Sequence, residues 1–189
     1  RKEKNYKNDI DKKQKLSNQL NKEIEKLIKE AIKESNKNST KNVFTLTPEA
    51  KLTAKNFLSN KGNLPWPVER GVIIQRFGLQ PHPVVRTTKI QSNGIVIATT
   101  KNASVRSVFN GVVLSVLKFK SSNLTVLIQH GNYITAYKNL ASVFVEKGQK
   151  VSSLESIGIT FDNDETKTTL QFSIFENTKA LDPYLWIAK

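Results

Sequence analysis

The sequence contains two histidines, His82 and His130, and no cysteine, so side chains that bind a catalytic transition metal are scarce. A catalytic zinc ion needs about three His, carboxylate or thiolate ligands, and an open position for the water that it acidifies. The two histidines lie far apart in the sequence. We therefore predict no catalytic residue, no metal site and no cofactor.

Each remaining candidate for metal chemistry has a structural interpretation. His130 precedes a turn glycine at the end of a strand-like run, which is typical of a buried structural histidine. His82 lies between two prolines, where it could contact a ligand. Three acids close together could bind a hard cation through oxygen atoms: Asp162, Asp164 and Glu165. Their spacing lacks a full calcium-loop pattern and favours a solvated hairpin tip.

The chain of 189 residues is strongly basic, with 30 Lys and Arg against 16 Asp and Glu and a formal net charge of +14. This charge favours an anionic partner, such as nucleic acid, a membrane surface or an acidic wall polymer. Few of the basic residues are arginine, the residue that recognises phosphates and base edges through a planar fork. We therefore expect no nucleic-acid partner. A general bias toward Lys and Asn is an alternative source of the charge.

Residues 1–36 contain no Gly or Pro, and their apolar residues recur every three or four positions from Leu16 onward, at Leu20, Ile24, Leu27 and Ala31. This spacing predicts one helix with one apolar stripe. We expect it to be the end of a longer coiled coil, although docking on its own domain would also bury the stripe. Because the chain starts without methionine, we expect it to be a piece of a longer protein.

Residues 37–63 predict a linker and a short helix. The run from 35 to 46 is rich in Asn, Ser, Thr and Lys, and Thr47 and Pro48 then form a helix-start signal. We expect this helix to end near residue 59 and to pack on the following domain through Leu52, Phe57 and Leu58.

Residues 64–189 consist of short β-branched or aromatic runs separated by Gly, Asn, Ser and Lys. About eight such runs with tight turns predict a mainly β fold, an antiparallel sandwich or open barrel. The fold class is therefore mainly β, preceded by an α-helical coiled-coil arm.

The order of motifs in residues 64–188 resembles the LytM-type (lysostaphin-type) zinc metallopeptidase domain of bacterial cell-wall hydrolases. The resemblance rests on eight segments in the family's order, at residues 76–83, 92–98, 108–113, 126–140, 145–151, 157–158, 169–175 and 181–186. It implies the antiparallel fold that the strand pattern predicts, and a groove at the positions of the family's active site.

Active members of that family carry His-x-Gly-x-Asp, Tyr-x-His-Leu and His-x-His motifs. In this sequence the five chemical positions of these motifs are Ser92, Val96, Asn139, Thr169 and Gln171. Val96 is the most damaging change, because a hydrocarbon replaces a charged oxygen ligand. The resemblance therefore implies a degenerate peptidase domain that is not an enzyme.

A coiled-coil arm before such a domain resembles the EnvC-like or NlpD-like murein hydrolase activators. The resemblance implies a periplasmic or other extracytoplasmic protein that binds and activates a cell-wall amidase during septum splitting. Peptidoglycan, and a septal membrane protein that binds the coiled coil, are further expected partners. Two alternatives stay open: a passive binder of peptidoglycan or another anionic envelope polymer, and an active zinc endopeptidase.

We expect the partner to bind in a groove formed by the five changed positions and a basic rim. Its expected lining is Ser92, Val96, Asn139, Thr169, Gln171, Arg76, His82 and Arg86. The helix at 48–59 is a candidate cover for this groove in an inactive state.

Overall fold

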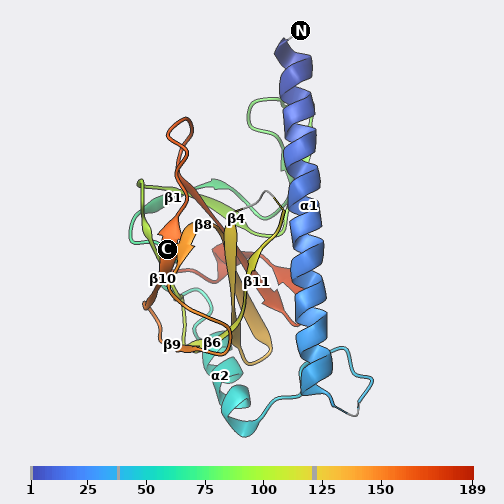
Figure 1. Ribbon diagram of the computed structural model, residues 1–189, viewed down its shortest axis with the longest axis vertical. Helices are drawn as coiled ribbons and strands as arrows, with labels where there is room; N and C mark the ends of the chain where they lie inside the picture. The colour runs from blue at the N-terminus through green and yellow to red at the C-terminus, as the bar shows by residue number, and fades with distance from the viewer. Residues whose placement is uncertain (1, 38, 121–122) are drawn as a thin grey trace.

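The computed structural model describes residues 2–37, 39–120 and 123–189, and shows a long helix beside a β domain (Figure 1). The long helix, α1, spans Lys2–Ser35, and α2 spans Pro48–Ser59. As predicted, α2 begins with a cap, because the Thr47 hydroxyl accepts a hydrogen bond from the Ala50 amide at 3.2 Å. The predicted end of α2 near residue 59 is also confirmed.

The β domain is antiparallel throughout its named strand pairs, which confirms the predicted fold class. Its strands are β1 (Gly71–Gln75), β2 (Gly78–Pro81), β3 (Lys89–Ser92), β4 (Ile95–Thr99), β5 (Ser104–Arg106), β6 (Gly111–Lys118), β7 (Leu124–His130), β8 (Tyr133–Val143), β9 (Lys150–Val151), β10 (Ser156–Thr160), β11 (Thr169–Glu176) and β12 (Lys179–Leu181). The main sheet has the order β1-β4-β11-β8-β7-β6-β9. In addition, β10 pairs with β5 and β8, β12 pairs with β11, and β2 and β3 form a separate hairpin.

Alternation along the central strands gives the sheet two different faces, because successive side chains of a strand point to opposite sides. On β8, Tyr137 belongs to the main core, whereas its neighbour Ala136 belongs to a second apolar cluster. The second cluster combines Leu127, Ile134, Ala136 and Phe175 of the sheet with Leu20, Ile24, Ile28 and Ile32 of α1. The sheet is therefore covered by α1 on the face opposite the main core.

The apolar stripe of α1 is buried by the chain's own sheet. Ile24 and Ile28 are fully buried, and Leu20 and Ile32 are nearly so. Figure 1 shows α1 running along the whole length of the β domain. The helix is confirmed, and the stripe predicted as a coiled-coil seam packs on the sheet in this structure, so a second strand would have to compete with the sheet for it.

Helix α2 packs at the end of the domain where β7 and the C-terminal segment meet. Phe57 is fully buried, and its ring lies 4.8 Å from that of His130 and 5.1 Å from that of Trp186. The expectation that Leu52 and Leu58 also pack on the domain was wrong, since both are more than half exposed. A helix of twelve residues touches the domain along one narrow side, which Ala54 and Phe57 occupy.

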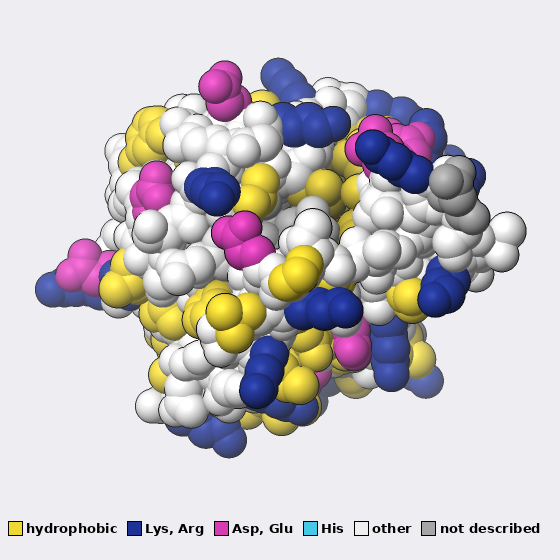
Figure 2. Space-filling model, turned by 90° about the horizontal axis from the view of Figure 1, so that it is seen from below, with side chains coloured by type: hydrophobic (Ala, Val, Ile, Leu, Met, Phe, Trp, Pro, Cys, Tyr) yellow, Lys and Arg dark blue, Asp and Glu magenta, His cyan; other side chains and the backbone are white. Residues whose placement is uncertain are grey.

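The positive charge is dispersed over the face of the molecule that is seen from below (Figure 2). On the face seen in Figure 2, Lys and Arg side chains alternate with neutral, apolar and acidic ones and form no continuous patch. Neither helix in the described part of the chain is long and apolar enough to cross a bilayer.

Candidate functional site

A cavity of about 490 Å³ lies between α1 and the sheet, beyond the end of the apolar contact. On the α1 side it is lined by Ile10, Gln14 and Ser17, and on the other by residues of β3, β4, β8 and β11. The Gln14 side chain pairs with the backbone of Gln91, donating to its carbonyl at 3.0 Å and accepting from its amide at 3.3 Å. This amide pairing joins α1 to β3 at the cavity.

The floor of the cavity is formed by a row of cross-strand neighbours. Val96 on β4 lies opposite Gln171 on β11, and Gln171 lies opposite Lys138 on β8. These residues follow the apolar positions of the same sheet face, because Lys138 comes two residues after Ala136. The covered face is thus apolar under the second half of α1 and polar under the first half.

Lys138 is the charged side chain of this floor, and it is only 5% exposed. Its Nζ donates a hydrogen bond to the Asn21 side-chain oxygen on α1 at 3.0 Å. Burial lowers the pKa of Lys138 to about 8, since the charged form loses its water. Lys138 was not among the site residues predicted from the sequence. It is an alternate residue of β8 after Ile134 and Ala136, and this alternation places it on the covered face.

Ser92 and Gly94 form the rim where β3 turns into β4. The Ser92 hydroxyl donates to the Gly94 carbonyl at 2.8 Å and is therefore occupied locally. A side chain at Gly94 would collide with the Phe172 carbonyl and the Ser173 hydroxyl, so glycine is required where these strands approach. The structure thus places Ser92 and Val96 at the cavity, as predicted.

Asn139 and Thr169 do not line the cavity, contrary to the predicted groove. Asn139 sits at an irregular register between β7 and β8 with a φ of 76°, a left-handed conformation that Asn tolerates better than most residues. Its amide donates to the Thr169 carbonyl at 2.7 Å and accepts from the Asn123 amide at 2.7 Å. These bonds tie the bulge to β11 and use the side chain structurally.

The predicted basic rim is mostly absent. Of the three residues predicted for this rim, only His82 lines the cavity. Its Nδ1 accepts hydrogen bonds from the Val84 and Val85 amides at 3.2 and 3.1 Å. The guanidinium of Arg76 stacks 3.5 Å above the Tyr184 ring, at the C-terminal segment. Arg86 is exposed on the loop after β2 and does not line the cavity.

The groove is covered by α1, so the hypothesis that the helix at 48–59 covers it was wrong. Figure 1 shows α2 at one end of the domain and α1 alongside the sheet. The stacking of Phe57 on His130 holds α2 at that end. The apolar stripe of α1, which is longer, buries the sheet face that leads to the groove.

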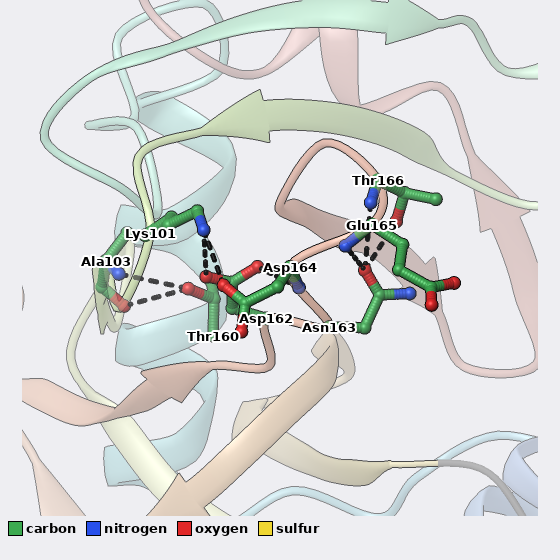
Figure 3. A network of polar contacts seen from close by, with 8 residues as sticks. All are labelled: Lys101, Ala103, Thr160, Asp162, Asn163, Asp164, Glu165 and Thr166. Atoms are coloured by element: carbon green, nitrogen blue, oxygen red, sulfur yellow. Dashed lines mark hydrogen bonds and ion pairs between the residues drawn. The ribbon is translucent and has the colours of Figure 1, made fainter.

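Neither His130 nor the acidic loop contributes to the groove. His130 is fully buried, with Nδ1 2.6 Å from the Asn110 carbonyl and Nε2 2.9 Å from the Thr135 hydroxyl, which confirms its structural role. In the acidic loop, Lys101 lies 2.5 Å from Asp164 and 3.6 Å from Asp162 (Figure 3). A lysine of the same chain therefore neutralises these carboxylates at an exposed tip.

Comparison with known proteins identifies the fold. Residues 90–183 match the profile of peptidase family M23. This segment is a peptidase family M23 domain. Over 80 residues the chain is 36% identical to the peptidoglycan DD-endopeptidase ShyA of Vibrio cholerae, a match that covers 42% of this chain and 18% of ShyA. The M23 domain is thus related to cell-wall hydrolases, and the chain spans less than a fifth of that relative.

Solved structures show the same M23 fold. A zinc-containing peptidase from Vibrio cholerae superposes with a TM-score of 0.57 at 24% identity, covering 68% of this chain and 41% of the peptidase. A chain of the SpoIIQ–SpoIIIAH pore-forming complex gives a TM-score of 0.55 at 22% identity, covering 68% of this chain and 93% of that one.

The residues at the M23 motif positions do not fit a zinc ion. Val96 offers no donor atom, Gln171 offers a neutral amide, and the Ser92 hydroxyl is bonded to Gly94. The Asn139 side chain is bonded to the Thr169 carbonyl at the bulge. Within residues 2–37, 39–120 and 123–189, no three His, Asp or Glu side chains are grouped as a metal site would require.

Proposed function

We propose that this chain is a non-catalytic regulator that binds and activates a peptidoglycan amidase when a dividing bacterium splits its septum. The observation that carries the proposal is the M23 groove itself: its motif positions do not fit a zinc ion, and a helix of the same chain covers it. A groove of this kind is suited to bind a protein segment, as apolar and polar grooves do in helix recognition. The domain would act by contact.

Binding requires the first half of α1 to leave the groove. That half is held by a hydrogen-bonded pairing through Gln14, and Asn21 adds one hydrogen bond near the middle of the helix, whereas the second half buries Ile24 and Ile28. Segments with few buried apolar contacts open at lower free-energy cost than core segments. The amidase thus competes with the polar half of α1. A coiled-coil partner, for which we propose a septal membrane protein, would have to compete with the sheet for the apolar stripe of the second half.

The proposed location is the extracytoplasmic envelope, the periplasm in a bacterium with two membranes. Support comes from the M23 domain and from a relative that is named for its action on peptidoglycan. An activator of a wall amidase has to meet the enzyme where the wall is.

Dye release from labelled sacculi tests the proposal. Purified chain, a purified amidase from the same organism, and the two together are compared. We expect strong release only from the mixture. Release by the chain alone, with one equivalent of bound zinc, would identify an endopeptidase instead and overturn the proposal.

A pair of variants connects activation to the groove. Val96→Arg places a bulky charge in the cavity, which has room for it, and we expect it to weaken amidase binding without unfolding the domain. Val72→Arg is the matched control, because Val72 is 67% exposed on β1 and does not line the cavity. Equal affinity of both variants for the amidase would place the binding site elsewhere.

A further inference from the structure

Lys138 is the one charged side chain that the β domain contributes to the wall of the cavity, within the residues that the structure describes. The other titratable side chain on that wall is His82, and the rest, from Gln75 on β1 to Gln171 on β11, are neutral. No carboxylate of the described chain forms an ion pair with Lys138. A buried ammonium with an amide as its partner lacks the compensation that buried charges usually have.

Two buried hydroxyls near Lys138 also lack partners. Thr125 lies directly opposite Lys138 on β7, and its Oγ1 has no hydrogen bond. The Ser173 Oγ on β11 is likewise buried without a partner, and Ser173 lines the cavity. Buried polar atoms are nearly always hydrogen-bonded. The floor therefore holds the Lys138 ammonium and the Ser173 hydroxyl, whose bonding capacity α1 leaves unfilled, and the unpaired Thr125 hydroxyl lies beside them on the neighbouring strand.

The present occupant of the groove is a helix that places a neutral side chain, Asn21, at the ammonium. Its amide oxygen supplies one hydrogen bond and no charge. A carboxylate at the same point would supply both, and charge-assisted bonds are about twice as strong as neutral ones. An occupant of the same shape with an acid at this point would therefore displace α1.

We propose that Lys138 is the anion subsite of the groove, and that it receives an Asp or Glu side chain from a helix of the amidase that takes the place of α1. The inference rests on the proposed function and specifies the chemistry of its partner. Asn21 then acts as a neutral placeholder, which covers the ammonium but binds it weakly enough to be exchanged.

The experiment uses the full chain and two single variants, Lys138→Met and Asn21→Asp. Lys138→Met keeps the length of the side chain and removes the charge, and we expect amidase affinity to fall by roughly thirtyfold or more. Asn21→Asp gives α1 its own carboxylate for Lys138, so amide exchange of α1 should slow and amidase affinity should fall by about tenfold. In the double variant, the amide exchange of α1 should no longer be slowed, because the carboxylate introduced at position 21 then has no ammonium to pair with.

Lys120→Met is the matched control, since Lys120 also bonds α1 through a neutral amide, that of Gln19 at 3.3 Å, but is exposed. We expect it to bind the amidase as the unmodified chain does. If Lys138→Met and Lys120→Met bind the amidase equally well, the subsite is wrong while the proposed function stands.

The remaining outcomes separate the two proposals. If no amidase is bound or activated by the unmodified chain, the proposed function fails, and the assignment of an amidase helix fails with it. If Lys138→Met instead loses sedimentation with purified sacculi, carboxylates of peptidoglycan are the ligand and the helix is wrong.

Discussion

His130 shows how one buried side chain makes the M23 domain sensitive to acid. Its Nδ1–H donates to the Asn110 carbonyl, and Nε2 lies 2.9 Å from the Thr135 hydroxyl, so both ring nitrogens have a polar partner. Stacking on Phe57 adds a contact that joins α2 to the sheet. Desolvation lowers the pKa of His130 to about 4, against 6.5 for an exposed histidine.

Because the folded pKa lies below the unfolded one, the unfolded chain binds the proton more readily between pH 6.5 and 4. The contribution of His130 is therefore complete above pH 6.5 and is lost as the pH falls toward 4. We expect a loss of about 2–3 kcal/mol between pH 7 and 4.5, measured by urea unfolding. His130→Gln should be less stable at pH 7 and should lack this part of the pH dependence. An unchanged pH dependence in His130→Gln would show that other groups cause it.

Lys138 has the same relation to pH over a higher range, because burial lowers the pKa of this cation too. With α1 docked its pKa is about 8, and with α1 released we expect it to return toward 10.5. Docking of α1 should therefore strengthen as the pH rises from 8 to 10.5, by up to about 3 kcal/mol. Tyr6, Asp9, Lys13 and His82 face the same cavity and also carry or gain charge.

The rate of amide exchange in α1, corrected for the intrinsic effect of pH, measures this change. In Lys138→Met the strengthening should be largely absent, whereas Lys120→Met should keep it. If Lys138→Met retains the full effect, Lys138 is not its cause.

At the scale of elements, α1 combines two kinds of contact along one helix. Its second half buries branched side chains against β7, β8 and β11, and its first half rests on hydrogen bonds over a cavity. An isolated helix with so many lysines is marginal in water, so its order depends on the sheet. Weakening the apolar half should therefore release the whole helix.

Ile28→Ala tests this dependence. Ile28 is fully buried between α1 and the sheet, and we expect its truncation to destabilise α1 docking by about 2–4 kcal/mol. Amide exchange of α1 should accelerate, and less chain should be needed for half-maximal amidase activation. Leu58→Ala on α2 is the control, because Leu58 is about half exposed and its truncation should change stability little. If Ile28→Ala accelerates exchange equally in β7 and β8, α1 and the sheet unfold as one unit.

Sequence patterns predicted the elements better than their contacts. The stripe through Leu20 and Ile24 predicts a helix, and Thr47 and Pro48 predict the start of α2, because these signals are local. The spacing of an apolar stripe does not indicate which surface covers it. A coiled-coil helix and a sheet can both pack against apolar side chains that recur every three or four residues. The contact of Lys138 with Asn21 depends on the same missing information, since it forms only where α1 docks.

The predicted positions of the groove residues agree with the structure where the alternation of a strand alone decides them. Val96 and Gln171 lie on the same sheet face in any antiparallel pairing of β4 with β11 that keeps the core side chains inside, and in the observed register they are cross-strand neighbours. Asn139 was misplaced because a bulge changes where its side chain points. Arg76 was misplaced because it stacks on Tyr184, a contact between residues far apart in sequence.

At the scale of the whole molecule, the net charge of +14 and the groove predict two different responses to salt. On the face shown in Figure 2, the basic side chains are dispersed and lie on the surface, where solvent ions reach them directly. Screening at 0.1 M salt already limits such charges to about 10 Å. The Lys138 subsite is buried and is screened far less.

Sedimentation with purified sacculi, without amidase, should therefore decline steeply between about 50 and 500 mM salt, because dispersed charge is its only source of attraction. Amidase activation should persist over the same range, since the groove excludes solvent when it is occupied. Sacculus binding that persists at 500 mM salt would contradict this view and indicate a shaped peptidoglycan site. Activation that disappears together with sacculus binding would mean that the regulator works by concentrating on the wall, and that its groove is not required.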